Sequence, residues 1–205
     1  MDLQDHLDLV DWRRRVGDAY RLPSLEAWRA ARDRLIREHP QSPIPPAERA
    51  SFGGLRWFPA DPAYRVAARL LPGDGELVEI DTGGDDGVIR CRRAGSLHFR
   101  LHDQACSLTV LALIGYGSGL FVPFRDSTSG FETYGGGRYL VDTVKNTDAG
   151  CLETRVGSLD VVIDFNYAYN PSCVYSPRWA CPLAPAENWL RVPVRAGEMN
   201  SAAQE

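Results

Sequence analysis

The first forty residues carry apolar positions at helical spacing. Leu3, Leu7 and Val10 recur every three or four residues, and the pattern then breaks before Ser24, which stands where a helix N-cap is expected. A second apolar stripe follows: Leu25, Trp28, Leu35 and Ile36. The sequence predicts a helical segment over residues 1–40 that packs on the main domain, in preference to an amphipathic pair that meets a membrane or a partner helix.

A proline-rich stretch over residues 41–54 cannot form regular structure and is predicted to be a linker. From Leu55 onward the apolar period becomes two, which is typical of strands. The expected strands are Tyr64–Leu71, Glu76–Asp81, Val88–Arg93, Ser96–His102, Ser107–Ile114, Gly119–Phe124, Arg138–Thr143, Ser158–Phe165 and Leu190–Val194. Because no crossover helices lie between them, residues 55–199 are predicted to form a mainly β domain, an antiparallel β-barrel or sandwich.

Two aperiodic regions interrupt the strands. The first runs from residue 124 to 139, and the second is a long C-terminal loop from residue 164 to 188. Loops of this length in a compact domain are usually functional or disordered, and the aromatic residues of the second argue against disorder. We expect disorder only in the tail, residues 200–205.

The composition narrows the function classes. The chain has 205 residues and a formal net charge of −4, which gives no support to a nucleic-acid or anionic-membrane partner. The N-terminus lacks the basic and apolar regions of a secretory signal, and no apolar run approaches the ~20 residues that span a bilayer. Five cysteines are sparse for a secreted scaffold, so reduced thiols and a cytoplasmic location are expected.

Three residues are candidates for catalysis. Asp164 and Asn166 share a face at the end of the strand predicted before the long loop, where an acid commonly performs site chemistry. Capping of the loop's backbone donors explains the two residues equally well. Glu132 is the second candidate acid, and Cys173 is the candidate nucleophile.

Two arginines suggest recognition of an anion. Arg125 and Arg138 bracket Asp126 and Glu132, and a guanidinium fork matches carboxylate or phosphate groups. The alternative is that the arginines pair with these acids internally. Together with the aromatic residues nearby, the predicted ligand-binding set is Arg125, Asp126, Tyr134, Arg138, Asn166, Asn170, Tyr175, Glu187 and Asn188.

Cys173 and Cys181 allow several interpretations. They fit a thiol nucleophile, a disulfide across the loop, a metal site or buried packing thiols, and packing is favoured. A metal site is the weakest, because no C-x-x-C motif occurs. No P-loop, dinucleotide-binding or hydrolase motif is present, so no cofactor is expected.

The two aperiodic regions carry a series of short ordered motifs: Pro123-Phe124-Arg125-Asp126, Ser129–Tyr134, Gly137-Arg138-Tyr139, Asp164-Phe165-Asn166, Asn170-Pro171-Ser172-Cys173, Cys181-Pro182, Pro185–Asn188 and Ala196-Gly197-Glu198. In these motifs the chain resembles domain-of-unknown-function family 1684, an uncharacterised bacterial and archaeal family. Residues 51–58 are similar to an earlier aromatic segment of that family. The resemblance implies a mostly β fold and a shared polar site, and it implies no established activity.

Three functions remain open from the sequence. The leading hypothesis is a small-molecule site at one end of a β-barrel, where an enzyme would act on a polar or anionic substrate by acid/base or thiol chemistry. The second is a non-catalytic module that binds a small ligand. In the third, the polar residues only tether the long loop, and the functional surface lies elsewhere.

Overall fold

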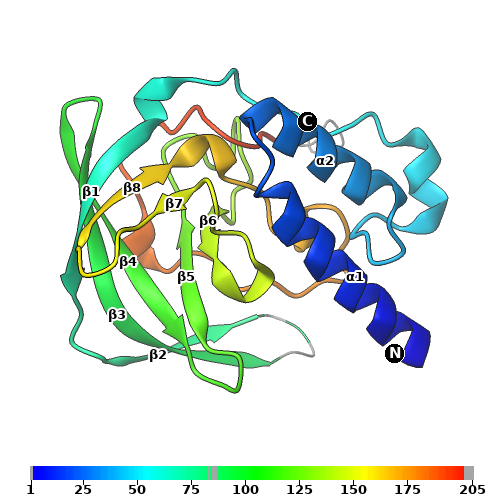
Figure 1. The fold of residues 1–205 in the computed structure, drawn as a ribbon, viewed down its shortest axis with the longest axis horizontal. Helices are drawn as coiled ribbons and strands as arrows, with labels where there is room; N and C mark the ends of the chain where they lie inside the picture. Colours follow the sequence, from blue (N-terminus) through cyan, green and yellow to red (C-terminus); the bar gives the residue numbers. More distant parts are fainter. Residues whose placement is uncertain (1, 83, 85–86, 201–205) are drawn as a thin grey trace.

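A computed structural model describes residues 2–82, 84 and 87–200, and its centre is a strongly curved antiparallel sheet (Figure 1). The strands are β1 Arg65–Pro72, β2 Leu77–Asp81, β3 Val88–Leu101, β4 Gln104–Leu113, β5 Gly119–Phe124, β6 Arg138–Asp142, β7 Leu152–Glu153 and β8 Asp160–Asp164. Their order is β6-β5-β4-β3-β1-β8-β7, with β2 paired to β3. The sheet forms a nearly closed barrel. The mainly β prediction is therefore confirmed, and of the two predicted architectures, barrel and sandwich, the structure has the barrel.

Two details of the strands differ from the sequence pattern. The expected pair Val88–Arg93 and Ser96–His102 is one strand, β3, whose register shifts at a bulge between Arg93 and Gly95. The apolar run Leu190–Val194 forms no strand, because its backbone bonds to a loop, the Arg125–Ser127 segment, although Leu190, Val192 and Val194 are buried. The alternating apolar residues therefore predicted burial correctly in this segment, but not whether it pairs with a neighbouring strand.

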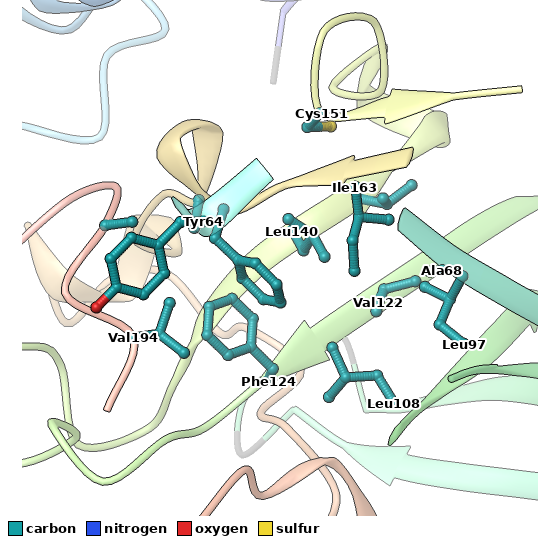
Figure 2. Packing of buried hydrophobic residues seen from close by; sticks show 14 of the residues in the cluster. Tyr64, Ala68, Leu97, Leu108, Val122, Phe124, Leu140, Cys151, Ile163 and Val194 are labelled. Atoms are coloured by element: carbon teal, nitrogen blue, oxygen red, sulfur yellow. The ribbon is translucent and has the colours of Figure 1, made fainter. Parts of the chain in front are cut away.

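Hydrophobic side chains from every wall fill the barrel interior. Figure 2 shows Ala68, Leu97, Leu108, Val122 and Ile163 pointing toward one another, and all five are buried. The residues around them form one continuous cluster that also includes apolar side chains of both N-terminal helices. The helices and the barrel consequently share a core.

The two helices lie on one side of the barrel, beside the C-terminal segments (Figure 1). Helix α1 spans Leu3–Ala19 and begins with a reciprocal capping box between Asp2 and Asp5. Helix α2 spans Leu25–Glu38, and Ser24 caps it by accepting a hydrogen bond from Ala27 N at 3.2 Å. Trp28 of α2 is 1% exposed and packs edge-on against Tyr20 and Trp57. This aromatic cluster joins the helices to the barrel.

The segment after α2 is irregular but packed. Ser42 is buried and its hydroxyl donates to Ile36 O, while Pro46–Ser51 forms a short 3₁₀ helix, η1. Asn200 donates to the carbonyls of Glu132 and Phe131; residues 201–205, which carry most of the expected disordered tail, lie outside the described residues. Among the described residues, neither helix has the length and apolar character needed to cross a bilayer.

The C-terminal loop crosses the barrel end and passes under the helices. It contains the 3₁₀ helices η4 Phe165–Tyr167, η5 Ser172–Val174 and η6 Ala186–Asn188. Isolated bridges pair Tyr139 with Tyr169, Arg125 with Trp189, and Trp57 with Glu198. The loop is thus fixed to β6, to the segment after β5 and to the segment before β1.

Candidate functional site

A buried ion pair, Asp126–Arg138, closes one end of the barrel. Arg138 Nη2 lies 3.0 Å from Asp126 Oδ2, and both side chains are 1% exposed. Arg138 also donates to the carbonyls of Val194, Ala196 and Glu198. Burial lowers the pKa of the Arg138 guanidinium, and the carboxylate of Asp126 opposes that effect. These contacts fix the strand β6 to the C-terminal segment.

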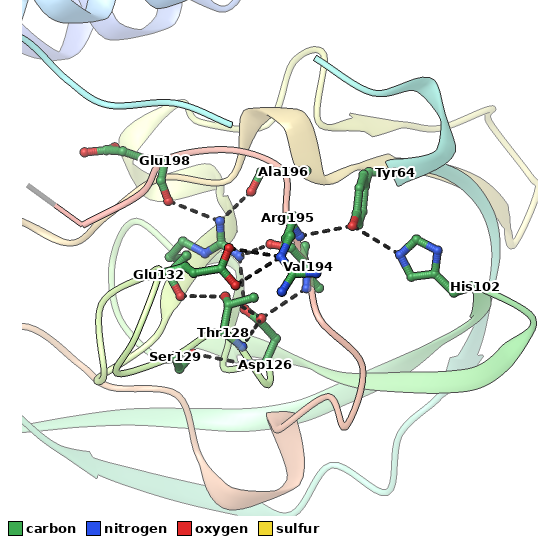
Figure 3. Close-up of polar contacts among 12 residues, drawn as sticks. Tyr64, His102, Asp126, Thr128, Ser129, Glu132, Val194, Arg195, Ala196 and Glu198 are labelled. Atoms are coloured by element: carbon green, nitrogen blue, oxygen red, sulfur yellow. Dashed lines mark hydrogen bonds and ion pairs between the residues drawn. The ribbon is translucent and has the colours of Figure 1, made fainter. Parts of the chain in front are cut away.

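The Asp126 carboxylate is saturated by its own surroundings. Besides the Arg138 bond, its Oδ1 accepts from Thr128 N at 2.8 Å, Thr128 Oγ1 at 2.6 Å and Val194 N at 3.1 Å (Figure 3). A carboxylate with four donors has little remaining capacity for a ligand. Asp126 and Arg138 therefore tie loops together, and we name them with Thr128 and Val194 the barrel-end cluster.

Asn188 ties η6 to the sheet. Its Oδ1 accepts from Thr109 N at 2.7 Å, and its Nδ2 donates to Thr109 O and Pro123 O. The side chain is completely buried. Asn188 thereby supplies hydrogen bonds to β4 and β5 backbone groups, which is a structural role.

Asp164 and Asn166 form a loop cap at the end of β8. Asp164 Oδ1 accepts from Asn166 N at 2.9 Å and Asn166 Nδ2 at 2.8 Å, and Asn166 also exchanges bonds with the backbone of Asp61. Burial raises the pKa of Asp164, against the lowering effect of these bonds. The capping interpretation of this pair describes the observed contacts.

Three predicted residues make separate side-chain contacts away from the two loop ties above, and of these Arg125 is partly buried. Glu132 accepts from Arg195 Nε at 2.9 Å, and Glu187 accepts from Arg93 Nη2 at 2.8 Å. Arg125 stacks its guanidinium 5.0 Å above the Trp189 ring. Apart from the Asp126–Arg138 pair, the predicted arginines and acids are therefore distributed over separate contacts.

A cavity of about 440 Å³ lies between helix α1, helix α2 and the C-terminal loop. Three predicted or noted residues line it: Asn170, Tyr175 and Cys181. Aromatic rings form much of the remaining wall: Trp12, Tyr139, Tyr169 and Trp179. Its volume falls in the range of about 300–1,000 Å³ that small-molecule sites usually have.

Glu198 lies behind the polar side of this cavity and does not line it, but it bonds to three residues that do. Its carboxylate accepts from Asn170 N at 3.1 Å, Asn170 Nδ2 at 3.2 Å and Arg32 Nη2 at 3.3 Å, and also from the Tyr175 hydroxyl. Gly197 has φ of +76°, and an added Cβ there would lie 2.5 Å from Ala168 O, so only glycine fits the turn that places Glu198. We name Arg32, Asn170, Tyr175 and Glu198 the cavity cluster.

Two polar atoms of the cavity cluster have no partner in the described part of the chain. They are Arg32 Nε, a donor, and Asn170 Oδ1, an acceptor, and both are buried. Arg32 and Asn170 both line the cavity. A buried polar group without a hydrogen bond costs about 1–3 kcal/mol, so these atoms are suited to a ligand or ordered water.

The electrostatics of the wall favour an anion. Among the described residues that line the cavity, Arg13, Arg32 and Lys145 are basic and none is acidic, although Lys145 pairs with the carboxylate of Asp142 at 3.2 Å. Arg32 is partly neutralised by Glu198, and its guanidinium lies 4.6 Å from the Tyr169 ring centre. The charged and aromatic groups together define a wall with donors at one side and apolar faces at the other.

Arg32 and Lys145 line the cavity but were not predicted from the sequence. Arg32 lies on the apolar stripe of α2, four residues after Trp28 and three before Leu35, and a lone arginine on a buried helix face was the available signal. Lys145 gives no such signal, because its place beside the cavity depends on the turn after β6.

Cys173 lies near the cavity but does not line it. Its sulfur is 3.8 Å from the Tyr134 hydroxyl and within hydrogen-bond reach of Cys181, and all five cysteines are free thiols. Burial raises the pKa of Tyr134 to about 12. No group of three or more metal-ligating side chains occurs among the described residues.

Comparisons with known proteins agree with this architecture. No curated protein matches the chain. The solution NMR structure of an uncharacterized protein from Haloarcula marismortui is similar, with 40% identity, a TM-score of 0.63, and coverage of 85% of this chain and 91% of that one. The family model described as protein of unknown function (DUF1684) matches residues 50–199, most of the barrel and the C-terminal loop. The chain therefore belongs to the DUF1684 family.

Proposed function

We propose that the protein binds a compact anionic small molecule in the cavity between the helices and the C-terminal loop. The observation that carries the proposal is a pair of buried atoms without partners in the described structure, Arg32 Nε and Asn170 Oδ1, in a wall whose described charged residues are all basic. The ligand's anionic group would accept from Arg32, and a hydroxyl or amine of the ligand would donate to Asn170.

The aromatic wall supports an apolar body for this ligand. Trp12 comes from α1 and Trp179 from the C-terminal loop, so a ligand between them would contact both sides of the cavity. Flat aromatic faces bury large apolar area with few torsions to fix. A carboxylate attached to one ring or to two fused rings, aromatic or aliphatic, matches this volume.

Binding is favoured over acid/base catalysis at this site. The candidate acids Asp164 and Glu132 bond to Asn166 and Arg195, and neither lines the cavity. The remaining carboxylate, Glu198, accepts hydrogen bonds from Arg32, Asn170 and Tyr175. Thiol chemistry is the enzymatic alternative, and it is treated below.

The proposal includes a cytoplasmic location and no nucleic-acid or membrane partner. The five free thiols support a reducing compartment, and the net charge of −4 disfavours polyanions.

Calorimetric titration with 2-naphthoate, and with uncharged 2-naphthylmethanol as its match, tests the proposal. Leu9 of α1 lines the cavity, whereas the next residue, Val10, is exposed and does not. We expect saturable binding of the anion that Leu9→Trp weakens by about tenfold or more, because the larger ring fills the space. Val10→Trp is the matched control. Equal affinity in the two variants, or equal affinity for the two compounds, would contradict the proposal.

A further inference from the structure

Two thiols meet at the wall of the cavity. Cys173 belongs to η5, and Cys181 lies eight residues further along the loop and is 9% exposed. The Cys173 thiol is within hydrogen-bond reach of the Cys181 sulfur, and Cys181 is the one that lines the cavity. The pair therefore has one sulfur facing the open volume and one sulfur behind it.

The surroundings of Cys181 favour its thiolate. The hydrogen bond from Cys173 lowers the pKa of Cys181, with further contributions from the backbone N–H groups of Cys173 and Ser172 and from the Lys145 ammonium. The same contact and burial raise the pKa of Cys173. Cys181 thus differs from the remaining three cysteines, whose pKa values burial raises: Cys91, Cys106 and Cys151.

The other titratable groups around the pair do not supply a competing base. Tyr134 and Tyr139 face the thiols, and burial raises the pKa of each phenol, so both are neutral at pH 7. Lys145 lies 5.4 Å from the Tyr139 ring centre and 3.2 Å from the carboxylate of Asp142. The charged groups beside the thiolate are therefore the Lys145 ammonium and, paired with it, the Asp142 carboxylate.

We propose that Cys181 and Cys173 are a redox-active dithiol that reduces a small hydroperoxide entering the cavity. Cys181 is the attacking sulfur and Cys173 the resolving sulfur. This is an activity beyond the proposed binding function, and neither requires the other.

The step balances with two thiols as the reductant. The Cys181 thiolate attacks one peroxide oxygen, the O–O bond breaks, and the leaving alkoxide takes a proton to become an alcohol. Cys181 is then a sulfenic acid. The Cys173 sulfur attacks it, the S–S bond forms, and the hydroxyl leaves as water with the Cys173 proton. Two electrons pass from the two thiols to the peroxide.

The burial of the pair selects the oxidant. Cys181 is reached through a cavity of about 440 Å³, which admits a small hydroperoxide but not the disulfide of a folded protein. Polarisation of the O–O bond can come from the Lys145 ammonium near the thiolate.

The test mixes reduced full-length protein with tert-butyl hydroperoxide at pH 6 and follows each cysteine by peptide mass. We expect one equivalent of hydroperoxide consumed and a Cys173–Cys181 disulfide, with Cys181 oxidised about tenfold faster than Cys106. In Cys173→Ser, a cyclic 1,3-diketone should trap the sulfenic acid on Cys181. In Cys181→Ser, consumption should fall at least to the rate of Cys106, while Cys106→Ser, the control, leaves disulfide formation unchanged.

Two results would overturn the dithiol. One is oxidation spread evenly over the cysteines at pH 6; the other is hydroperoxide consumption that leaves both Cys173 and Cys181 as thiols. In wild-type protein the failure of one proposal is distinguishable from the failure of the other. A Cys173–Cys181 disulfide formed by the hydroperoxide without any binding of 2-naphthoate would contradict the binding function alone. Binding of 2-naphthoate with both thiols left unoxidised would contradict the dithiol alone.

Discussion

The barrel-end cluster and the cavity cluster contain the same kinds of residue in different surroundings. Each has a buried arginine and a buried carboxylate, and each ties the C-terminal segment to another element. Arg138 and Arg32 both retain an Nε without a partner in the described structure. Only Arg32 lines the cavity; Arg138 instead packs its guanidinium 5.2 Å from the Phe124 ring centre. A binding site therefore differs from a purely structural contact in the open volume beside its polar groups, more than in polarity itself.

The largest effect should come from the barrel-end cluster. Arg138→Met leaves Asp126 buried without its counter-charge, so we expect the free energy of unfolding to fall by about 3–5 kcal/mol in urea titrations. The double variant Asp126→Asn/Arg138→Met should recover part of the loss. A stable Arg138→Met variant that has lost 2-naphthoate binding would place function at the barrel end and break the comparison.

Substitution of Asn188 should have the second-largest effect on stability. Asn188→Ala leaves backbone groups of Thr109 and Pro123 without partners in the interior, and we expect a loss of about 2–3 kcal/mol in the free energy of unfolding. The neighbouring Glu187→Gln is the control, since it changes only a surface pair with Arg93. Comparable losses from the two substitutions would contradict the structural role of Asn188.

Asp164→Asn should have a small effect that depends on pH. Burial raises the pKa of Asp164 in the folded protein, so its ionisation opposes folding, and this contribution grows as pH rises from the ordinary carboxyl pKa through the raised one. The asparagine keeps the acceptor for Asn166 and does not ionise. Relative to wild type, the variant should therefore gain stability between pH 3 and pH 7, with a net change of about 1 kcal/mol or less.

The exposed Asp160→Asn is the control for this titration, because Asp160 is paired with Arg69 on the surface. Naphthoate affinity should be unchanged in Asp164→Asn. Loss of 2-naphthoate binding in a folded Asp164→Asn variant would show that Asp164 belongs to the binding site.

Glu132→Gln should have the smallest effect. The pair with Arg195 is on the surface, with 37% and 57% of the two side chains exposed, so the expected change is about 0–1 kcal/mol and it should disappear in high salt. Thermal unfolding at low and high ionic strength measures it. A salt-independent loss well above that range would show that Glu132 has a role beyond this pair.

The fold was largely predictable because burial follows local periodicity. Alternating apolar residues marked the long strands, and Ser24 marked the start of α2. The two-residue strand Leu152–Glu153 is too short to carry a pattern, and Leu190–Val194 shows that burial can occur without a ladder. The local sequence pattern predicts which side chains are buried, whereas tertiary packing determines which residues they contact.

The site was predictable only in part, for the same reason. Asn170 and Tyr175 stood out in the aperiodic loop, and both bond to Glu198. Glu198 also pairs with Arg32, which is 166 residues away in the sequence, so no local pattern could show this contact. The empty volume beside them arises from how α1 and α2 rest on the loop, which no local pattern records. Polar density in the sequence therefore identified Asp126 and Arg138 of the barrel-end cluster and Asn170 and Tyr175 of the cavity cluster, but it did not separate the two clusters.

The five tryptophans allow the central claim to be tested in one measurement. A ¹H–¹⁵N spectrum resolves the indole signals while 2-naphthoate is added. Trp12 and Trp179 line the cavity, whereas Trp189 packs against Arg125, one of the predicted ligand-binding arginines. We predict saturable shifts of the Trp12 and Trp179 signals with Trp189 unchanged. Shifts confined to Trp189 would contradict the account and assign binding to the surface that carries Arg125.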